Sequence, residues 1–427
     1  MSLFTKNKAL EKIYSAQISS LCKEEDLPKE TIESALEKGT MVLLANPNHH
    51  MGKAMLIGQP ARIKVNANIG TSPLCSTIEK ELDKVKAAKD AEADTIMDLS
   101  TEGDLDTIRE KMLDAWNLPL GTVPIYAIGK KIMSENRAIT SMTKDELFDE
   151  IEKQCKQGVD FITVHCGLSK RGAELAIGQK RTLGIVSRGG SMLARWMVEN
   201  DKENPLLSDY DRLLDICRPY NVTLSLGDGL RPGAGCDAGD AAQWEEVIRL
   251  GELAAYGLER GVQCMIEGPG HMPLHLVRGQ IEGIKRLTHN APLYVLGPLV
   301  CDATPGYDHI AGAIGGAIGV TAGVDFLCYL TPAEHLTLPT VDDVKKGILA
   351  SRVAAHAGEV SIGTKRALQR EEAINRARKN LDWEGMAANA IDPVIVKERR
   401  EAHKQEEVCA MCGKFCSVKM LRDVKSK

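Results

Sequence analysis

The feature of this chain that most restricts its fold is a recurring unit: an apolar run, a turn, and a stretch with helical spacing. Within each run the apolar residues are continuous rather than alternating, which is typical of parallel strands buried on both faces. Strand–helix alternation on this scale predicts a parallel sheet. Nine runs occur: IKVNANIG (63–70), TIMDLS (95–100), TVPIYAI (122–128), FITVHCG (161–167), LGIVSRGG (183–190), VTLSLGDG (222–229), VQCMIEGPG (262–270), LYVLGPL (293–299) and DFLCYL (325–330).

We expect an α/β fold built on a closed (βα)8 barrel, with a doubly wound open sheet as the alternative. A closed barrel needs eight strands, so one of the nine runs should be short or lie outside it. The 427 residues suit one such barrel with extensions. The predicted parts are an N-terminal extension at 1–60, a catalytic barrel at 61–358, and a helical linker with a cysteine tail at 359–427.

Polar side chains and tyrosines end eight of the runs, at the rim where barrel enzymes carry their active sites. Ordinary turn chemistry explains aspartate and glycine at strand ends well, but it explains His165 and Glu267 poorly. The eight residues are Asn68, Asp98, Tyr126, His165, Ser187, Asp228, Glu267 and Tyr294.

Charge and hydropathy exclude two classes of partner. A net charge of −5 favours no nucleic acid. The N-terminal residues lack the apolar core of an export signal, and no run reaches the roughly 20 apolar residues of a membrane span. We therefore expect a cytoplasmic protein with neither nucleic-acid nor membrane partners.

The last cysteines of the chain form a cluster, Cys409, Cys412 and Cys416, with the spacing C-x2-C-x3-C. Soft thiolates this close select zinc or an iron–sulfur cluster. Structural zinc prefers four ligands, and the nearest fourth candidate, His403, has an unfavourable spacing. The spacing therefore favours a [4Fe–4S] cluster, with zinc as the alternative. Each of the nine other cysteines is expected to be a small buried apolar residue.

Three cysteines leave one iron of such a cluster without a protein ligand. S-adenosylmethionine chemistry needs this vacancy, because the methionine moiety binds the open iron before a carbon–sulfur bond is broken reductively. The order of the spacing is the reverse of the commonest radical motif.

Two histidines follow strands directly, His271 in EGPGH and His335 in TPAEH. Histidines at two strand ends can converge on one metal ion across a barrel mouth. Zinc is the metal we expect, and a hydrogen-bonding role at the rim is the alternative.

Two glycine-rich turns carry arginines, SRGG (187–190) with Arg188 and GDGLRPG (227–233) with Arg231. Bare glycine amides and a guanidinium can bind one phosphate together, so these turns predict a phosphorylated substrate. No G-x-G-x-x-G or Walker A sequence supports a nucleotide.

Taken together, these segments resemble the radical S-adenosylmethionine enzymes that act on 5-aminoimidazole ribotide. The resemblance runs from about Ile63 to Met420. Its motifs, in the family's order, are NANIGTSP, MDLST, GTVPIY, SRGG, LSLGDGLRPG, EGPGH, GYDHI, CYLTPAEHL and the cysteine tail.

The resemblance implies a role for each matching residue. His271 and His335 would bind Zn2+, and Cys409, Cys412 and Cys416 would hold the [4Fe–4S] cluster used with S-adenosyl-L-methionine. It also implies an external electron donor and a homodimer in which the tail reaches the partner's active site. Glu267 and His165 are the expected proton-transfer residues, by position alone. The residues expected to bind the ribotide are Asn68, Met97, Tyr126, His165, Ser187, Arg188, Gly189, Asp228, Gly229, Leu230, Arg231, Glu267 and Tyr294.

Two loops depart from the pattern of the thiamine enzymes in this family. AGCDAGD (234–240) and CDATPGYDH (301–309) introduce Cys236 and Cys301. Because the ribotide-binding positions are kept while the loops change, we expect a paralogue with the same substrate and another product, 5-hydroxybenzimidazole, the cobalamin lower-ligand precursor. The alternative is the phosphomethylpyrimidine synthase reaction of thiamine biosynthesis. An alternative of another class is a non-catalytic zinc-binding barrel.

Overall fold

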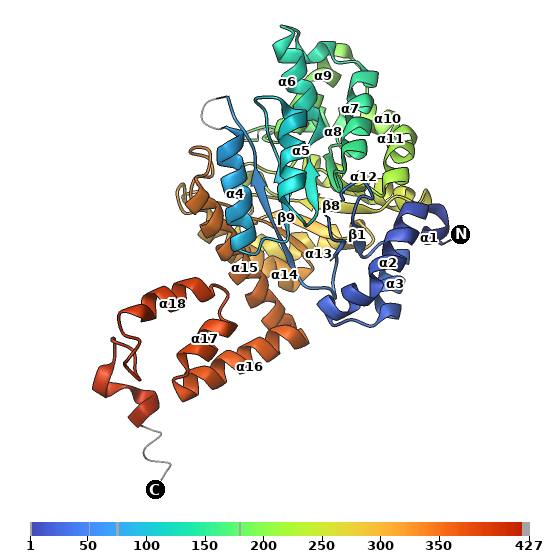
Figure 1. The fold of residues 1–427 in the computed structure, drawn as a ribbon. Helices are drawn as coiled ribbons and strands as arrows, with labels where there is room; N and C mark the ends of the chain where they lie inside the picture. The colour runs from blue at the N-terminus through green and yellow to red at the C-terminus, as the bar shows by residue number, and fades with distance from the viewer. Residues whose placement is uncertain (1, 51, 74–76, 179–180, 421–427) are drawn as a thin grey trace. The chain divides into compact units, whose positions relative to one another are not determined.

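The computed structural model describes residues 2–50, 52–73, 77–178 and 181–420, and Figure 1 shows its ribbon. The chain forms two compact units, residues 1–358 and 359–427. The predicted boundary at residue 60 falls inside the first unit and stays a prediction. Each unit is described by itself.

The first unit contains a closed barrel of eight parallel strands, which confirms the predicted fold class. The strands pair in the order β10-β3-β4-β5-β6-β7-β8-β9, so the last strand closes on the first. Their bounds are β3 (Lys64–Ile69), β4 (Thr95–Asp98), β5 (Leu120–Thr122), β6 (Phe161–Val164), β7 (Thr223–Leu226), β8 (Cys264–Gly268), β9 (Leu293–Leu296) and β10 (Phe326–Cys328).

The run at 183–190 is the one that forms no strand. Ser187 accepts a hydrogen bond from the Gly190 N–H and thereby caps a helix, α9 (Arg188–Asn200). The run at 122–128 is also mostly helical, because Pro124 begins α6 (Pro124–Ser134) directly after β5. Ser187 and Tyr126 therefore lie at helix starts, and their expected places at strand ends were wrong.

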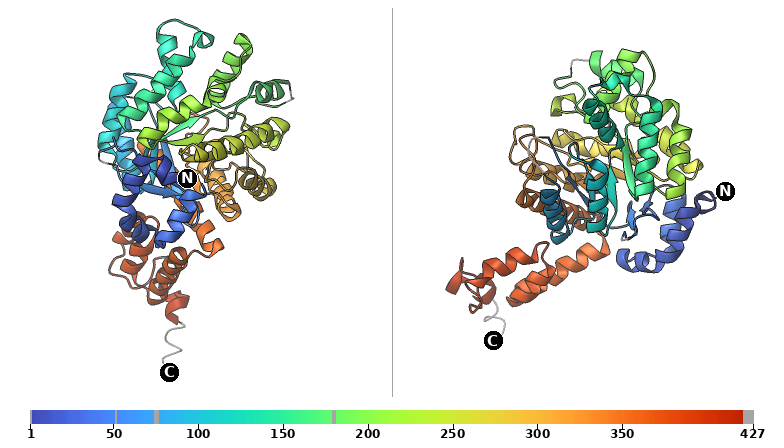
Figure 2. Two further views of the ribbon diagram at one scale, coloured as in Figure 1. Left: turned by 90° about the vertical axis from the view of Figure 1, so that its right-hand side faces the viewer. Right: turned by 45° about the horizontal axis from the view of Figure 1, so that its top comes forward.

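Helices surround the barrel, as both views in Figure 2 show. Local signals define some of them: Thr143 and Glu146 form a capping box at the start of α7, and Gly158 ends it with a φ of 106°. The remaining helices of this layer are α4 (Ile78–Asp90), α5 (Leu105–Ala115), α7 (Lys144–Gln157), α8 (Lys170–Gly178), α10 (Pro205–Ser208), α11 (Tyr210–Cys217), α12 (Ala241–Glu259), α13 (Val277–Leu287), α14 (Asp308–Ala322) and α15 (Val341–Ile362).

Large rings fill the centre of the barrel. Phe326 stacks on Tyr294 with ring centroids 4.3 Å apart, and it meets Phe161 edge-on at 6.4 Å. Gly121 on β5 makes room for them, because a Cβ there would lie 2.3 Å from the Phe161 ring. The interior below the rim is therefore packed, and a ligand can enter only from the carboxyl ends of the strands.

The first 60 residues cover the amino ends of the barrel strands. They form α1 (Leu3–Lys6), α2 (Lys8–Glu25), α3 (Lys29–Glu37) and an antiparallel pair, β1 (Val42–Leu44) with β2 (Met55–Ile57). The Asn46 N–H donates to Asp160 at 2.8 Å, just before β6, and the Gln59 N–H donates to Asp325 at 2.7 Å, just before β10. This segment thus closes the end of the barrel opposite the expected site.

The second unit is helical and ends in the cysteine tail. It contains α16 (Lys365–Asn380), α17 (Trp383–Asn389), α18 (Pro393–Glu401) and a short turn, η5 (Gly413–Phe415). The Arg400 guanidinium lies over the Trp383 ring at 3.9 Å and donates to the carbonyls of His403 and Glu406. The polar segment at 398–407 is therefore partly helix and partly folded onto α17.

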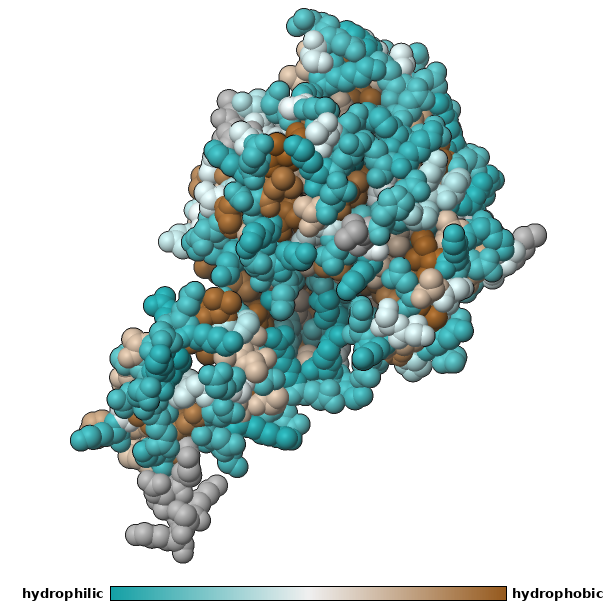
Figure 3. All heavy atoms as spheres, in the orientation of Figure 1, coloured by the Kyte–Doolittle hydropathy of each residue, from teal (hydrophilic) through white to brown (hydrophobic). Residues whose placement is uncertain are grey.

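On the face shown in Figure 3, hydrophilic side chains predominate and apolar ones gather in small groups. Among the described residues, no helix combines the length and apolarity required to cross a membrane.

Candidate active site

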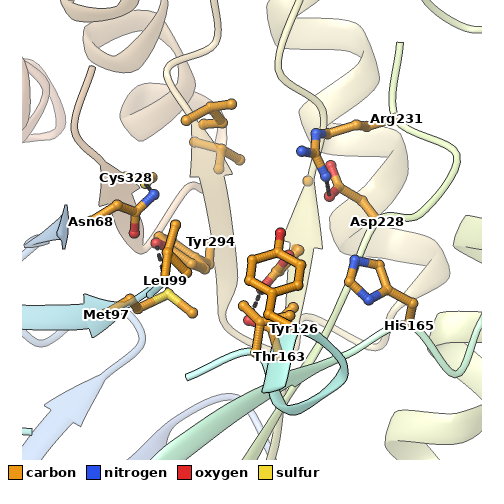
Figure 4. A pocket seen from close by; sticks show the side chains of 15 residues that line it. Asn68, Met97, Leu99, Tyr126, Thr163, His165, Asp228, Arg231, Tyr294 and Cys328 are labelled. Carbon is orange, nitrogen blue, oxygen red and sulfur yellow. Dashed lines mark hydrogen bonds and ion pairs between the residues drawn. The ribbon is translucent and has the colours of Figure 1, made fainter. Parts of the chain in front are cut away.

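A cavity of about 100 Å³ opens at the carboxyl ends of the barrel strands (Figure 4). Side chains from β3, β4, β6, β8, β9 and β10 line it, together with residues of the turns that follow β5 and β7. Eight of the thirteen predicted ribotide-binding residues are in this lining: Asn68, Met97, Tyr126, His165, Asp228, Arg231, Glu267 and Tyr294.

The other five predicted residues surround the lining. Gly189 packs on His165, since a Cβ there would lie 2.3 Å from the imidazole Cε1. Ser187 Oγ lies 2.9 Å from His165 Nε2. Gly229 and Leu230 lie in the turn between Asp228 and Arg231, and Leu230 is fully buried. Arg188 is exposed, with its guanidinium 4.8 Å from the centre of the Tyr126 ring.

Asp228 and Arg231 are in contact in the cavity wall, with Oδ1 and Nη1 3.2 Å apart. Burial raises the pKa of Asp228 to about 8 in spite of this cation. Burial opposes the charge of Arg231, but Asp228 beside it raises the guanidinium pKa. The Asp228 Oδ2 atom is buried without a hydrogen-bond partner among the described residues. The pair therefore presents an unused polar atom to a ligand.

Glu267 is held by two hydroxyl groups. Thr163 Oγ1 donates to its Oε1 at 2.6 Å, and Ser225 Oγ donates to the same oxygen at 2.7 Å. Burial raises the pKa of Glu267, although these hydrogen bonds act in the opposite direction. Thr163 and Ser225 were not among the predicted site residues. Thr163 could have been found, because it stands two positions before His165 and so faces the same side of one strand.

His165 is a neutral imidazole at neutral pH. Burial and the charge of Arg231 together lower its pKa to about 3. Nε2 shares a hydrogen bond with the Ser187 hydroxyl, and the tautomer decides which of the two atoms donates. Nδ1 has no partner within the part of the chain that the structure describes. Nδ1 can therefore form one hydrogen bond with a ligand, but His165 does not supply a positive charge.

Cys328 lines the cavity next to two asparagines. Its Sγ lies 3.1 Å from Asn68 Nδ2, and Asn66 Nδ2 donates to Tyr294 Oη at 2.8 Å. Burial raises the thiol pKa of Cys328 to about 12, so the thiol is protonated. Cys328 is buried as expected, and it also forms part of the cavity wall because its strand ends there. The expectation of burial was wrong for Cys236 and Cys301, which are exposed.

The two histidines predicted as metal ligands lie together, with ring centroids 5.2 Å apart. Nδ1 of His271 lies 2.8 Å from Asp302 Oδ1, and Nδ1 of His335 lies 3.1 Å from Asp308 Oδ1. A carboxylate on Nδ1 leaves Nε2 for a metal ion, the usual arrangement of metal-binding histidines. The pair fits a metal ion that keeps open positions for other ligands.

His335 also lines a second cavity of about 480 Å³, which shares Asn68 and Leu99 with the first. The cavity that His335 lines and the buried pocket thus share part of their lining.

The tail thiols are neighbours. Backbone amides of Met411 and Cys412 lower the pKa of the Cys409 thiol, while Cys409 and Cys416 raise that of Cys412. Three thiols around one turn have the donor chemistry of a cluster with three protein ligands, although the structure does not bring them together around one point. Across the described residues, no three His, Cys, Asp or Glu side chains are arranged to hold one metal ion.

Comparisons with known proteins agree over nearly the whole chain. The profile of the Radical SAM ThiC family matches residues 5–423. "Phosphomethylpyrimidine synthase" of Desulforamulus reducens is 49% identical over 403 residues, which cover 94% of this chain and 93% of the relative. The enzyme of the same name from Caldanaerobacter subterraneus subsp. tengcongensis is 47% identical, covering 97% and 96%. That from Methanocaldococcus jannaschii is 46% identical, covering 96% and 97%.

These relatives overturn the expectation of a 5-hydroxybenzimidazole product, since they carry the name of the thiamine-pathway alternative. The structure gives the physical reason for the error. No residue of 234–240 or 301–309 lines the buried cavity. Instead, the Gly235 N–H donates to Asp302 Oδ2 at 2.7 Å, beside His271. The loop at 301–309 therefore contacts the histidine pair, and neither divergent loop lines the pocket. The chain belongs to the Radical SAM ThiC family, enzymes that use S-adenosylmethionine with an iron–sulfur cluster.

Proposed function

We propose that this chain is a phosphomethylpyrimidine synthase. It would convert 5-aminoimidazole ribotide into 4-amino-5-hydroxymethyl-2-methylpyrimidine phosphate for thiamine biosynthesis. The observation that carries this proposal is the similarity of 46–49% identity, over 93% or more of both chains, to enzymes of that name. The cavity adds support, because it gathers eight of the residues expected to bind the ribotide.

The polar groups of the cavity match a small phosphorylated nucleoside-like substrate. Arg231 and the exposed Arg188 supply the cations for its phosphate. Asp228, protonated in large part at neutral pH, supplies a hydrogen-bond donor, and His165 Nδ1 supplies a second atom that can hydrogen-bond to the substrate. Glu267, fixed by Thr163 and Ser225, supplies an acceptor for ring or ribose protons.

The same groups suit radical chemistry. The wall of Met97, Tyr294 and Cys328 is buried, so a substrate in the cavity is shielded from water. Glu267 and His165 are the groups proposed to move protons during the rearrangement, because both face the cavity.

The cofactors are assigned by donor chemistry. Cys409, Cys412 and Cys416 would hold the [4Fe–4S] cluster, and His271 with His335 would hold Zn2+. With S-adenosylmethionine bound and an electron from an external donor, the cluster would supply the reductive cleavage of S-adenosylmethionine that gives the radical. We also propose a homodimer in which the tail of one subunit serves the site of the other, as the resemblance implies.

An anaerobic assay tests the proposal. Protein reconstituted with iron and sulfide is incubated with aminoimidazole ribotide, S-adenosylmethionine and dithionite, and products are identified by mass spectrometry. The expected products are the pyrimidine phosphate and 5′-deoxyadenosine, and Cys412→Ala should yield neither. A colourless protein that cleaves no S-adenosylmethionine would instead support the zinc-binding barrel. Cleavage without the pyrimidine would contradict the proposed substrate.

A further inference from the structure

Two side chains that do not line the cavity hydrogen-bond to the turn that carries Asp228 and Arg231. Between the two charged residues, the Leu230 peptide offers one donor and one acceptor. Both are bonded to side chains rather than to neighbouring strands. The positions of Asp228 and Arg231 therefore depend on these outer contacts.

Glu246 holds the donor. It lies in the second turn of α12 and is 2% exposed. Its Oε2 accepts the Leu230 N–H at 2.7 Å, and the Gly229 amide beside it acts to lower the pKa of the carboxyl group. Its Oε1 is buried and lies 3.1 Å from the position a Cβ on Gly229 would take. The carboxyl group thus packs directly against the backbone of the turn at Gly229 and Leu230.

Arg181 holds the acceptor. Its Nη2 donates to the Leu230 carbonyl at 2.8 Å, and its side chain is 2% exposed. Its Nε and Nη2 also donate to the two oxygens of Asp240, each at 2.6 Å. Asp240 caps the N-terminus of α12. Glu246 and Asp240, the residue that anchors Arg181, therefore both lie at the start of α12.

We propose that Glu246 and Arg181 are positioning residues that fix the Leu230 peptide and thereby hold Asp228 and Arg231 for ribotide binding. This inference rests on the proposed function, since it takes the ribotide as the ligand. Losing Glu246 would leave the buried Leu230 N–H without its acceptor, and a rotation of the turn would relieve this cost. Such a rotation would move Arg231 relative to the cavity.

A glutamine should replace Glu246 well. Burial raises the pKa of Glu246 well above its ordinary value, and Asp228 nearby raises it further. Glutamine reproduces the shape of this carboxyl group and the oxygen that accepts the Leu230 N–H, without the charge that burial disfavours. Alanine provides neither, so the pair Glu246→Gln and Glu246→Ala separates positioning from mere burial.

The test measures binding of aminoimidazole ribotide to the full chain by titration calorimetry, without cluster or S-adenosylmethionine. Glu246→Ala should bind about tenfold or more weakly. Glu246→Gln should bind within about twofold of the natural protein. In the reconstituted enzyme, Glu246→Ala should also release more 5′-deoxyadenosine per pyrimidine formed, because a misplaced substrate is missed by the radical.

Two further variants distinguish a loss of ribotide affinity from a general loss of stability. Glu25→Gln, which weakens a buried pair with Lys64 at the opposite end of the barrel, should lower the melting temperature and leave affinity unchanged. If Glu246→Ala does not fold, Arg181→Lys gives the second test, because lysine cannot bond Asp240 and Leu230 together. Natural affinity in either variant, or equal loss in Glu246→Gln, would overturn the inference. Failure of the natural protein to bind would instead count against the proposed function.

Discussion

At the amino end of the barrel, the buried charged residues at the starts of the strands have ionic partners. At the carboxyl end, two buried polar atoms have no hydrogen-bond partner among the described residues. Lys64 pairs with Glu25 at 2.8 Å, Asp160 with His49 at 2.8 Å, and Asp325 with Lys285 at 2.7 Å. At the other end, Asp228 Oδ2 and His165 Nδ1 are both unsatisfied.

The pKa shifts follow the same division. Burial alone would raise the pKa of Glu25, but Lys64 beside it lowers that pKa. At the carboxyl end, burial raises the pKa of Asp228 and Glu267 above their ordinary values. One end therefore stabilises the fold with its charges, while the other keeps polar groups in costly surroundings until a ligand arrives.

The largest expected effect is a loss of stability from a substitution at the amino end of the barrel. Lys64→Met leaves Glu25 buried without the cation at 2.8 Å, which should lower the free energy of unfolding by about 3–5 kcal/mol. Urea unfolding measures this loss, and calorimetry on protein that remains folded should show unchanged ribotide affinity. The double variant Lys64→Met with Glu25→Leu should recover much of the stability. A Lys64→Met protein as stable as the natural one would contradict this account.

The carboxyl end should respond in the opposite way. Arg231→Met removes the cavity cation while keeping an apolar stem, and ribotide affinity should fall about 100-fold. Stability should change little, because Asp228 can remain protonated when its partner is lost. Calorimetry and thermal unfolding of the same sample give both values. A large drop in melting temperature at unchanged affinity would reverse the roles assigned to the two ends.

A pH series sharpens the comparison through Asp228→Asn. The folded-state pKa of about 8 lies above the ordinary 3.8, so the folded protein keeps a proton that the unfolded chain loses. Asp228 therefore costs stability increasingly from about pH 4 to pH 8. The variant should gain stability over the natural protein across this range, by about 1.4 kcal/mol for each pH unit. Urea unfolding at pH 5 and pH 8.5 checks the sign, and a constant difference would contradict it.

Glu25→Gln provides the opposite slope. The folded-state pKa of Glu25 is lowered, so its stabilisation is present at neutral pH and is lost as the solution is acidified. The variant should be less stable than the natural protein at pH 7, and the gap should close toward pH 4.

The smallest effect belongs to the divergent loops. Cys301→Thr combined with Cys236→Ala should leave the product unchanged and the rate within about twofold. Both thiols are exposed, and neither lines the cavity. The anaerobic assay reads both quantities, and a new product from this variant would show that the loops act on the substrate after all.

Much of this architecture could be predicted from the sequence because parallel strands leave continuous apolar runs. The runs around Phe161 and Phe326 were found in this way. The run at 183–190 misled, because an N-cap serine followed by glycines resembles a strand end until its hydrogen bond is seen.

The candidate site was predictable where a motif carried it, as with Asp228, Arg231 and His271. Glu246 and Arg181 were missed, since their partners are backbone atoms of Leu230, and such contacts leave no residue pattern. Cys328 was missed because burial in a core and burial at a cavity wall look alike in a sequence.

The closing of the barrel sets the order in which the chain can mature on the ribosome. Asn68 and Cys328 meet in the cavity although 260 positions separate them. At ordinary rates of synthesis, the second appears roughly 10–50 seconds after the first. During that interval β3 has an unpaired edge that invites association with other nascent chains. The pocket is thus among the last parts of the barrel to be completed, and growth temperature or translation speed should affect its assembly first.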